Sequence, residues 1–247
     1  EVELYMENRR AKGFTVIQTV ILSELDGSDG INRPLINGSP STPDPDYFKW
    51  VDRVLEIAGE KGLYVGLLPT WGDKVDKQWG AGPEIFDEAN AREYGRWLGR
   101  RYADTPNIIW IIGGDRSGEG KNFTVWKAMA EGIKECDKRH LMTYHPQGEH
   151  SSSFWFHDET WLDFNMFQSG HAQRDYAIYR RLLLNDLQKQ PIKPVLDGEP
   201  RYENIPIDFK SENGRFDDFD VRMTLYQSMF SGACGYTYGC NEVWQMY

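Results

Sequence analysis

Two acidic residues each follow an apolar run that predicts a buried strand. Asp115 comes after residues 107–112 and two glycines, and Glu199 comes after residues 194–196 and is followed by a proline. Glycines let the backbone approach a ligand closely, and a proline restricts the conformation of the residue before it. Both carboxyl groups are therefore predicted to be held at strand ends.

A pair of opposed carboxyl groups can cleave a glycosidic bond. One delivers a proton to the leaving oxygen, and the other, ionised, attacks the anomeric carbon or activates water. Repulsion and partial burial would raise the pKa of one acid, and Arg116 or Arg201 would keep the other ionised. The alternative is that each acid only forms a structural ion pair with its neighbouring arginine. Asp197 competes with Glu199, because period-2 alternation puts both on one face; Glu199 is preferred because it lies farther out.

The elements that must position these acids alternate along the whole chain. Short apolar runs predict strands at 14–20, 63–68, 107–112, 140–144, 162–167, 194–196 and 233–238. Amphipathic runs predict helices at 2–12, 46–61, 87–102, 123–136, 176–188 and 218–231, with Asp87 as an N-cap. This order predicts a parallel sheet covered by helices.

The fold class expected from this order is α/β, as a (β/α)₈ TIM-type barrel that lacks its first strand and last helix. The first helical run stands where it would follow a strand, and the last strand has no closing helix. No linker interrupts the sequence, so residues 1–247 are expected to form one catalytic domain, a fragment of a longer protein. The rival is an open doubly wound sheet, but no glycine-rich phosphate loop follows the first strand.

Counted as the fourth and seventh strands of such a barrel, the two acid-bearing strands would place Asp115 and Glu199 across one barrel mouth. The active site of a barrel is built from the segments that follow its strands. The sequence is also rich in aromatic residues, whose flat rings stack on the C–H faces of sugars. The expected ligand is therefore a carbohydrate, and the candidate binding residues are Trp71, Asp73, Arg116, His145, Gln168, His171, Arg201, Tyr238 and Trp244.

Composition excludes other classes of partner. The formal net charge is −10, and no run of basic residues interleaves with aromatic ones, so neither nucleic acid nor an anionic membrane is expected as a partner. No segment approaches 18 consecutive apolar residues. The sparse cysteines, Cys136, Cys234 and Cys240, are expected to be reduced core thiols, although Cys234 and Cys240 could pair.

Histidines near strand ends raise a metallohydrolase as an alternative. The candidates would be His145, His150, His157 and His171 with Asp158 and Asp175. The HExxH motif is absent, and so is the pair of histidines that barrel metallohydrolases usually present at their first strand. No metal and no cofactor are therefore expected, and no GxSxG motif marks a serine nucleophile.

Several segments, taken in order, carry a family resemblance. KGFTVIQTV, GLYVGLLPTWGDKV, NIIWIIGGDR, LMTYHPQGEHSSSFWFHD, LDFNMFQSGH, PVLDGEPRYENIP and GACGYTYGCNEVWQMY resemble the apiosidase-like glycoside hydrolases over nearly the whole chain. The resemblance implies a (β/α)₈ barrel from bacteria that degrade plant cell walls, and removal of apiose from rhamnogalacturonan-II side chains. It further implies Asp115 as acid/base and Glu199 as nucleophile, and hence a retaining, exo-acting glycosidase.

The sequence leaves the location, the oligomeric state and the choice between functions open. The resemblance is compatible with a periplasmic or extracellular location, although no signal peptide is visible; the oligomeric state is undecided. A non-catalytic carbohydrate-binding barrel and, behind it, a metal-dependent hydrolase are the alternative functions. One departure from the family pattern is Asn241, at a position where members often carry histidine.

Overall fold

The computed structural model describes residues 1–24, 33–172 and 174–245. These residues group into two compact units, Glu1–Met142 and Thr143–Tyr247, which are described separately. The single-domain assignment stays a prediction. Within the described ranges, no helix is long and apolar enough to cross a membrane.

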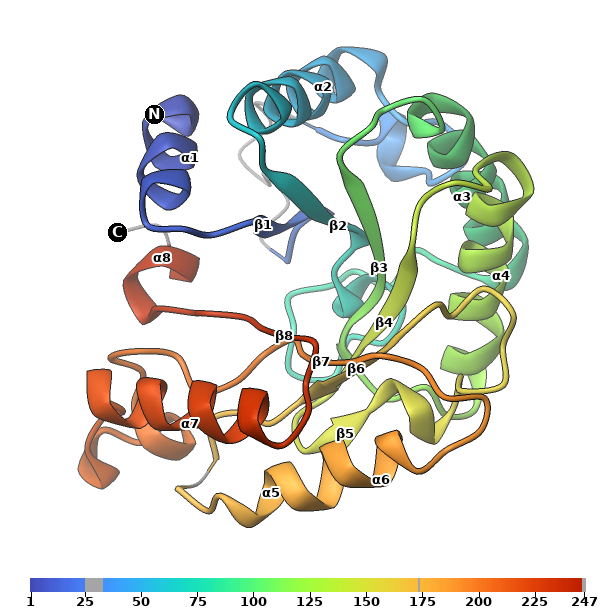
Figure 1. Cartoon of the computed structure of the whole chain (residues 1–247). Helices are drawn as coiled ribbons and strands as arrows, with labels where there is room; N and C mark the ends of the chain where they lie inside the picture. The colour runs from blue at the N-terminus through green and yellow to red at the C-terminus, as the bar shows by residue number, and fades with distance from the viewer. Residues whose placement is uncertain (25–32, 173, 246–247) are drawn as a thin grey trace. The chain divides into compact units, whose positions relative to one another are not determined.

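The first unit contains a parallel sheet in the order β1, β2, β3, flanked by helices. The strands are β1 (Val16–Leu22), β2 (Tyr64–Thr70) and β3 (Ile108–Arg116). The helices are α1 (Val2–Ala11), α2 (Pro45–Glu60), α3 (Glu88–Tyr102) and α4 (Lys121–Cys136). Figure 1 shows α2, α3 and α4 along one side of these strands, as the alternation of strands and helices predicts.

Local sequence explains where α3 begins and how it packs. Asp87 accepts a hydrogen bond from the Asn90 backbone N–H at 2.8 Å, and the Asn90 side chain accepts one from the Asp87 N–H at 2.9 Å. This reciprocal cap satisfies two N–H groups at the start of the helix and confirms Asp87 as the N-cap. A Cβ at Gly95 of α3 would lie 2.3 Å from the Met129 carbonyl oxygen of α4. Glycine therefore lets these helices pack closely.

The second unit contains a second sheet. The strands of this sheet are β5 (His150–Ser151), β6 (Asn165–Gln168), β7 (Val195–Asp197) and β8 (Gly235–Tyr236). β4 (Met142–Pro146), which starts at the last residue of the first unit, is not one of them. β6, β7 and β8 are parallel, and β5 is antiparallel to β6. The helical segments are α5 (Ala177–Tyr179), a π-helical turn (Arg180–Leu184), α6 (Asn185–Leu187), α7 (Asp218–Phe230) and α8 (Asn241–Gln245). Phe167, Leu182, Val195 and Ala233 belong to the apolar core that joins helices to strands.

The structure departs from the sequence expectations at several places. β3 continues to Arg116, so Asp115 lies inside the end of the strand rather than after it. β5 and α8 were not predicted, because elements of two and five residues carry too little periodicity to detect. The cysteines are free thiols, but Cys234 is exposed and the others half-buried, so their assignment to the core was wrong.

Candidate active site

Glu199 is held by two histidines in the second unit. His145 is part of β4, His171 lies three residues beyond β6, and Glu199 lies two residues beyond β7. His145 Nε2 lies 3.1 Å from Glu199 Oε2, and His171 Nε2 lies 3.0 Å from Glu199 Oε1. Glu199 keeps only 8% of its surface exposed, so neighbouring residues rather than bulk water surround its carboxyl group. The arrangement immobilises Glu199 at the end of its strand.

The register of β6 and β7 brings His171 to Glu199. Phe167 pairs with Asp197, and the Gly170 N–H donates to the Glu199 carbonyl oxygen at 3.0 Å. The two strands therefore continue side by side beyond their last paired residues. This alignment places both side chains at the same end of the sheet.

The hydrogen bonds of His145 constrain its protons. His145 Nδ1 lies 3.1 Å from the Pro146 carbonyl oxygen, which can only accept, so Nδ1 carries a proton. Nε2 then faces the Glu199 carboxyl favourably only if a second proton lies between them. That proton makes His145 an imidazolium or Glu199 a carboxylic acid.

The electrostatics of Glu199 favour the ionised form of its carboxyl group. Burial opposes ionisation of the carboxyl, but hydrogen bonds and charge from His145 and His171 outweigh it and hold the pKa of Glu199 well below its usual range. Glu199 is thus a carboxylate across the neutral range. For Glu199 it is the two histidines that lower the pKa; the expectation that Arg116 or Arg201 keeps one of the two acids ionised stays a prediction.

A second carboxyl group lies behind Glu199. Asp197 has no exposed surface and accepts hydrogen bonds from Ser169 Oγ at 2.8 Å and from Ser228 Oγ at 3.3 Å. Burial raises the pKa of Asp197 to about 7, because the hydrogen bonds from the serines do not outweigh the loss of water around the carboxyl group. The negative charge of Glu199 adds to the rise. Asp197 and Glu199 therefore have opposite shifts, which fits Glu199, not Asp197, as the ionised group.

Asp115 lies in a different setting in the first unit. It adopts φ of 58°, directly after Gly113 and Gly114, whose φ values of 92° and 136° suit only glycine. Aspartate tolerates this left-handed region better than most residues do. Trp79 Nε1 donates to Asp115 Oδ2 at 3.0 Å, and the Asp115 side chain keeps 20% exposure. The backbone and Trp79 together fix the direction of this carboxyl group.

Arg116 contacts both Asp115 and the loop that carries Trp79. It has no exposed surface, and its guanidinium donates to the carbonyl oxygens of Asp76, Lys77 and Asp115 at 2.6 to 3.0 Å. It also lies 3.6 Å from Asp115 Oδ2 and 4.6 Å from the centre of the Trp79 ring. Arg116 therefore positions both the loop that carries Trp79 and the Asp115 backbone.

The segment after β2 packs tightly against β3. A Cβ at Gly72 would lie 2.1 Å from the Gly114 carbonyl oxygen, so a side chain there cannot be accommodated without backbone movement. Asp73 is fully buried, pairs with Lys74 at 3.2 Å and accepts from the Gly82 N–H at 2.7 Å. Trp71 is half-buried beside Gly114. Asp73, predicted as a binding residue, thus holds this loop in place.

The other predicted binding residues in the second unit have varied settings. Arg201 is buried, with its guanidinium 4.6 Å from the Tyr176 ring centre and 5.2 Å from that of Phe216. Gln168 is 96% buried at the end of β6. Tyr238 donates to Glu203 Oε2 at 2.6 Å, and Trp244 on α8 is 51% exposed.

Trp79 was missed by the sequence analysis. It lies in the long segment between β2 and α3, eight residues after Trp71, and is 63% exposed. Its position in a tryptophan-containing loop after a strand was an available signal. Its contact with Asp115 could not be seen, because 36 residues separate them.

A metal site receives no support from the residues that the structure describes. No group of three histidine, cysteine, aspartate or glutamate side chains is arranged to hold an ion there. His145 and His171 address different oxygens of Glu199 rather than one common point.

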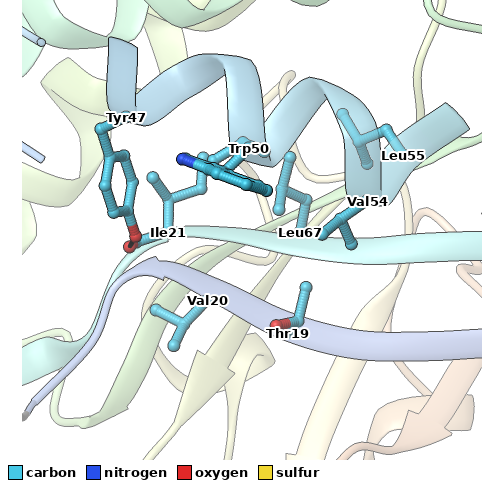
Figure 2. A pocket seen from close by; sticks show the side chains of 9 residues that line it. Thr19, Val20, Ile21, Tyr47, Trp50, Val54, Leu55 and Leu67 are labelled. Carbon is cyan, nitrogen blue, oxygen red and sulfur yellow. Dashed lines mark hydrogen bonds between the residues drawn. The ribbon is translucent and has the colours of Figure 1, made fainter. Parts of the chain in front are cut away.

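A separate hollow of about 450 Å³ lies in the first unit between α2 and strands β1 and β2 (Figure 2). Its walls are mostly apolar and include Val20, Ile21, Val54 and Leu67, with the exposed ring of Trp50 at its edge. No ionisable carboxyl or imidazole lines it, so it offers no groups for glycosidic cleavage.

Comparison with solved structures shows the fold of this chain and the class of protein, glycoside hydrolases, to which it is similar. A glycoside hydrolase shares 34% identity, with a TM-score of 0.84 over 100% of this chain and 58% of its own. A glycoside hydrolase family 5 protein from Bacteroides vulgatus ATCC 8482 shares 33% identity and a TM-score of 0.84, over 99% of this chain and 55% of its own. The chain thus spans less than two thirds of either protein. Pseudomonas stutzeri endoglucanase Cel5A, solved in complex with cellobiose, shares the fold at 14% identity and a TM-score of 0.66, over 96% of this chain and 74% of its own. The predicted (β/α)₈ class is confirmed, and the chain has the fold of a glycoside hydrolase catalytic domain.

The family follows from the sequence. A family model described as "Apiosidase-like, catalytic domain" matches residues 1–247, so the chain belongs to the apiosidase-like family, as its motifs predicted. A search of curated proteins finds no significant match.

Proposed function

We propose that this protein is a retaining, exo-acting glycosidase that removes a terminal apiose-like sugar from pectic oligosaccharides of plant cell walls. In this proposal Glu199 is the nucleophile and Asp115 the acid/base. The observation that carries it is the pair of histidines that keeps Glu199 buried, immobile and ionised at a strand end. Membership of the apiosidase-like family supports the choice of sugar.

The chemistry proceeds in two steps. Glu199 attacks the anomeric carbon, the bond to the leaving oxygen breaks, and Asp115 gives its proton to that oxygen. Asp115 then takes a proton from water, whose oxygen attacks the same carbon and displaces Glu199. Two inversions return the original anomeric configuration.

The test is a screen of the protein against apiose-containing fragments of rhamnogalacturonan-II, with the released monosaccharide identified by chromatography. We expect free apiose from the wild-type protein and none from Glu199→Gln. NMR of the first-formed anomer should show retention. A crystal structure should place the two carboxyl groups about 5–5.5 Å apart, whereas about 6.5–9.5 Å would indicate inversion.

Other outcomes would contradict the proposal. Glycan binding without hydrolysis by the wild-type protein would indicate a carbohydrate-binding module instead. Loss of activity on treatment with a chelator, with recovery on adding metal, would indicate a metal-dependent hydrolase. A separation above about 12 Å between the carboxyl groups would remove Asp115 from its role, because one sugar could not contact both.

A further inference from the structure

One exposed aromatic side chain lies beside the Glu199 cluster without a role in it. Phe209 is 68% exposed, and its ring meets the His171 ring edge-on, with centroids 5.7 Å apart and planes at 86°. His171 in turn contacts Glu199 at 3.0 Å. Only the side chain of His171 therefore lies between the exposed ring of Phe209 and the proposed nucleophile.

The backbone around Phe209 is held in a costly conformation. Asp208 and Phe209 have φ values of 55° and 57°, in the left-handed region. Aspartate enters this region readily, but a bulky residue such as phenylalanine rarely does, so the backbone at Phe209 is strained. A ring that is mostly exposed recovers little of this cost by burial.

The loop that carries Phe209 is well ordered by hydrogen bonds. The Ile207 N–H donates to the Gly214 carbonyl oxygen at 3.0 Å, and the Phe216 N–H donates to that of Ile205 at 3.2 Å. The Asp208 N–H donates to the His171 carbonyl oxygen at 2.9 Å. The last of these bonds ties the tip of the loop to the residue that holds Glu199.

Apolar packing anchors the base of the same loop. Ile205, Ile207 and Phe216 form a small buried cluster against Tyr202, whose ring centroid lies 4.4 Å from that of His171. The base of the loop is thus buried while its tip presents Phe209 outward. This division supports a rigid platform rather than a loosely placed side chain.

We propose that Phe209 forms an aromatic subsite beside Glu199, where its ring stacks on the C–H face of a substrate sugar. The inference rests on the proposed function and extends it to a residue that contacts the glycan without taking part in bond cleavage. An aromatic ring suits this task because its apolar face matches sugar C–H groups, and because a fixed ring loses little entropy on binding.

The test compares Phe209→Ala and Phe209→Tyr with wild type, using an apiose-containing pectic oligosaccharide. Phe230→Ala is the matched control, because Phe230 is an 87% exposed phenylalanine in the same unit, packed against Tyr226. We expect Phe209→Ala to raise KM by roughly 2- to 10-fold, and Phe209→Tyr and Phe230→Ala to stay near wild type. Melting temperatures should be similar, because both removed rings are exposed.

A binding measurement separates this inference from the proposed function. Calorimetric titration of the same oligosaccharide into Glu199→Gln, with and without Phe209→Ala, should show the same 2- to 10-fold loss of affinity. Unchanged affinity and unchanged KM would overturn the subsite. Binding that depends on Phe209 without cleavage by the wild-type protein would support the subsite and overturn the proposed function. An absence of glycan binding would overturn both.

Discussion

The surroundings of Glu199 and of Asp115 differ although both lie at the ends of parallel strands. Glu199 is 92% buried and contacts an imidazole at each carboxyl oxygen. Asp115 keeps 20% of its side chain exposed and accepts from the neutral N–H of Trp79, while Arg116 is largely engaged with backbone carbonyl oxygens.

This difference matches the different tasks that glycosidic cleavage sets. A nucleophile must be ionised and fixed before the substrate arrives, and the two histidines achieve both for Glu199. An acid/base must exchange its proton with water in each cycle, which the partial exposure of Asp115 permits. The comparison therefore supports the proposed roles, and four experiments can break or sharpen it.

The largest expected effect separates the roles of the two carboxyl groups. Glu199→Gln should lower kcat by about 10⁴-fold or more on every substrate, because no nucleophile remains. Asp115→Asn should lower it by about 10²- to 10⁴-fold on a natural glycoside but far less on an aryl glycoside, whose leaving group needs no proton. Steady-state kinetics on both substrates measure this, and equal losses for the two variants would refute the division of roles.

A second experiment tests the contact between His171 and the carboxyl group of Glu199. His171→Ala removes a hydrogen bond to a charged group and should lower kcat/KM by roughly 10- to 100-fold. Because His171 lowers the pKa of Glu199, its removal should move the acid limb of the kcat/KM profile to higher pH.

Two variants serve as controls for this effect. His171→Gln keeps a donor near the position of Nε2 and should recover part of the loss. His150→Ala, whose ring stacks on Trp155, should leave the limb in place. An unmoved acid limb in His171→Ala would show that this residue acts only in packing.

The third experiment concerns Asp197 and the pH dependence of stability. Its pKa rises from 3.8 to about 7 on folding, so between these values the folded protein binds a proton that the unfolded chain does not. The free energy of unfolding should therefore fall by a few kcal/mol as the pH rises from about 4 to 7.

Asp197→Asn should remove this fall, because the amide keeps the shape of the side chain without a charge. Urea unfolding at a series of pH values measures the change. Asp158→Asn is a control outside this buried network. The same slope in wild type and Asp197→Asn would contradict a neutral Asp197 in the folded protein.

The smallest effect is expected at Trp79. Trp79→Phe keeps an aromatic ring but removes the N–H that binds Asp115, and should lower kcat by roughly 2- to 10-fold. Trp50→Phe is the matched control, because Trp50 is similarly exposed but lies on α2. If both variants behave alike, the contact with Trp79 does not orient Asp115.

Sequence reasoning reached the strand ends but not the contacts made there. It placed Asp115 and Glu199 at strand ends and named His145 and His171, because apolar runs and turn residues are local signals. It assigned the stabilisation of a carboxylate to Arg116 or Arg201, since adjacency in sequence was the only contact available to it. His171 is 28 residues from Glu199, and only the register of β6 and β7 brings them together.

The sequence by itself determined the alternation of strands and helices, the family and the two candidate acids, because periodicity and motifs are written in neighbouring residues. The tertiary structure decided three contacts. Two histidines contact the carboxyl oxygens of Glu199, the Trp79 N–H donates to Asp115, and the exposed ring of Phe209 packs against His171. The residues in each contact are far apart in the sequence. The separation is 54 positions for His145 and Glu199, 36 for Trp79 and Asp115, 28 for His171 and Glu199, and 38 for His171 and Phe209. Strand register and loop packing set such distances, and neither is encoded in any short stretch of the chain.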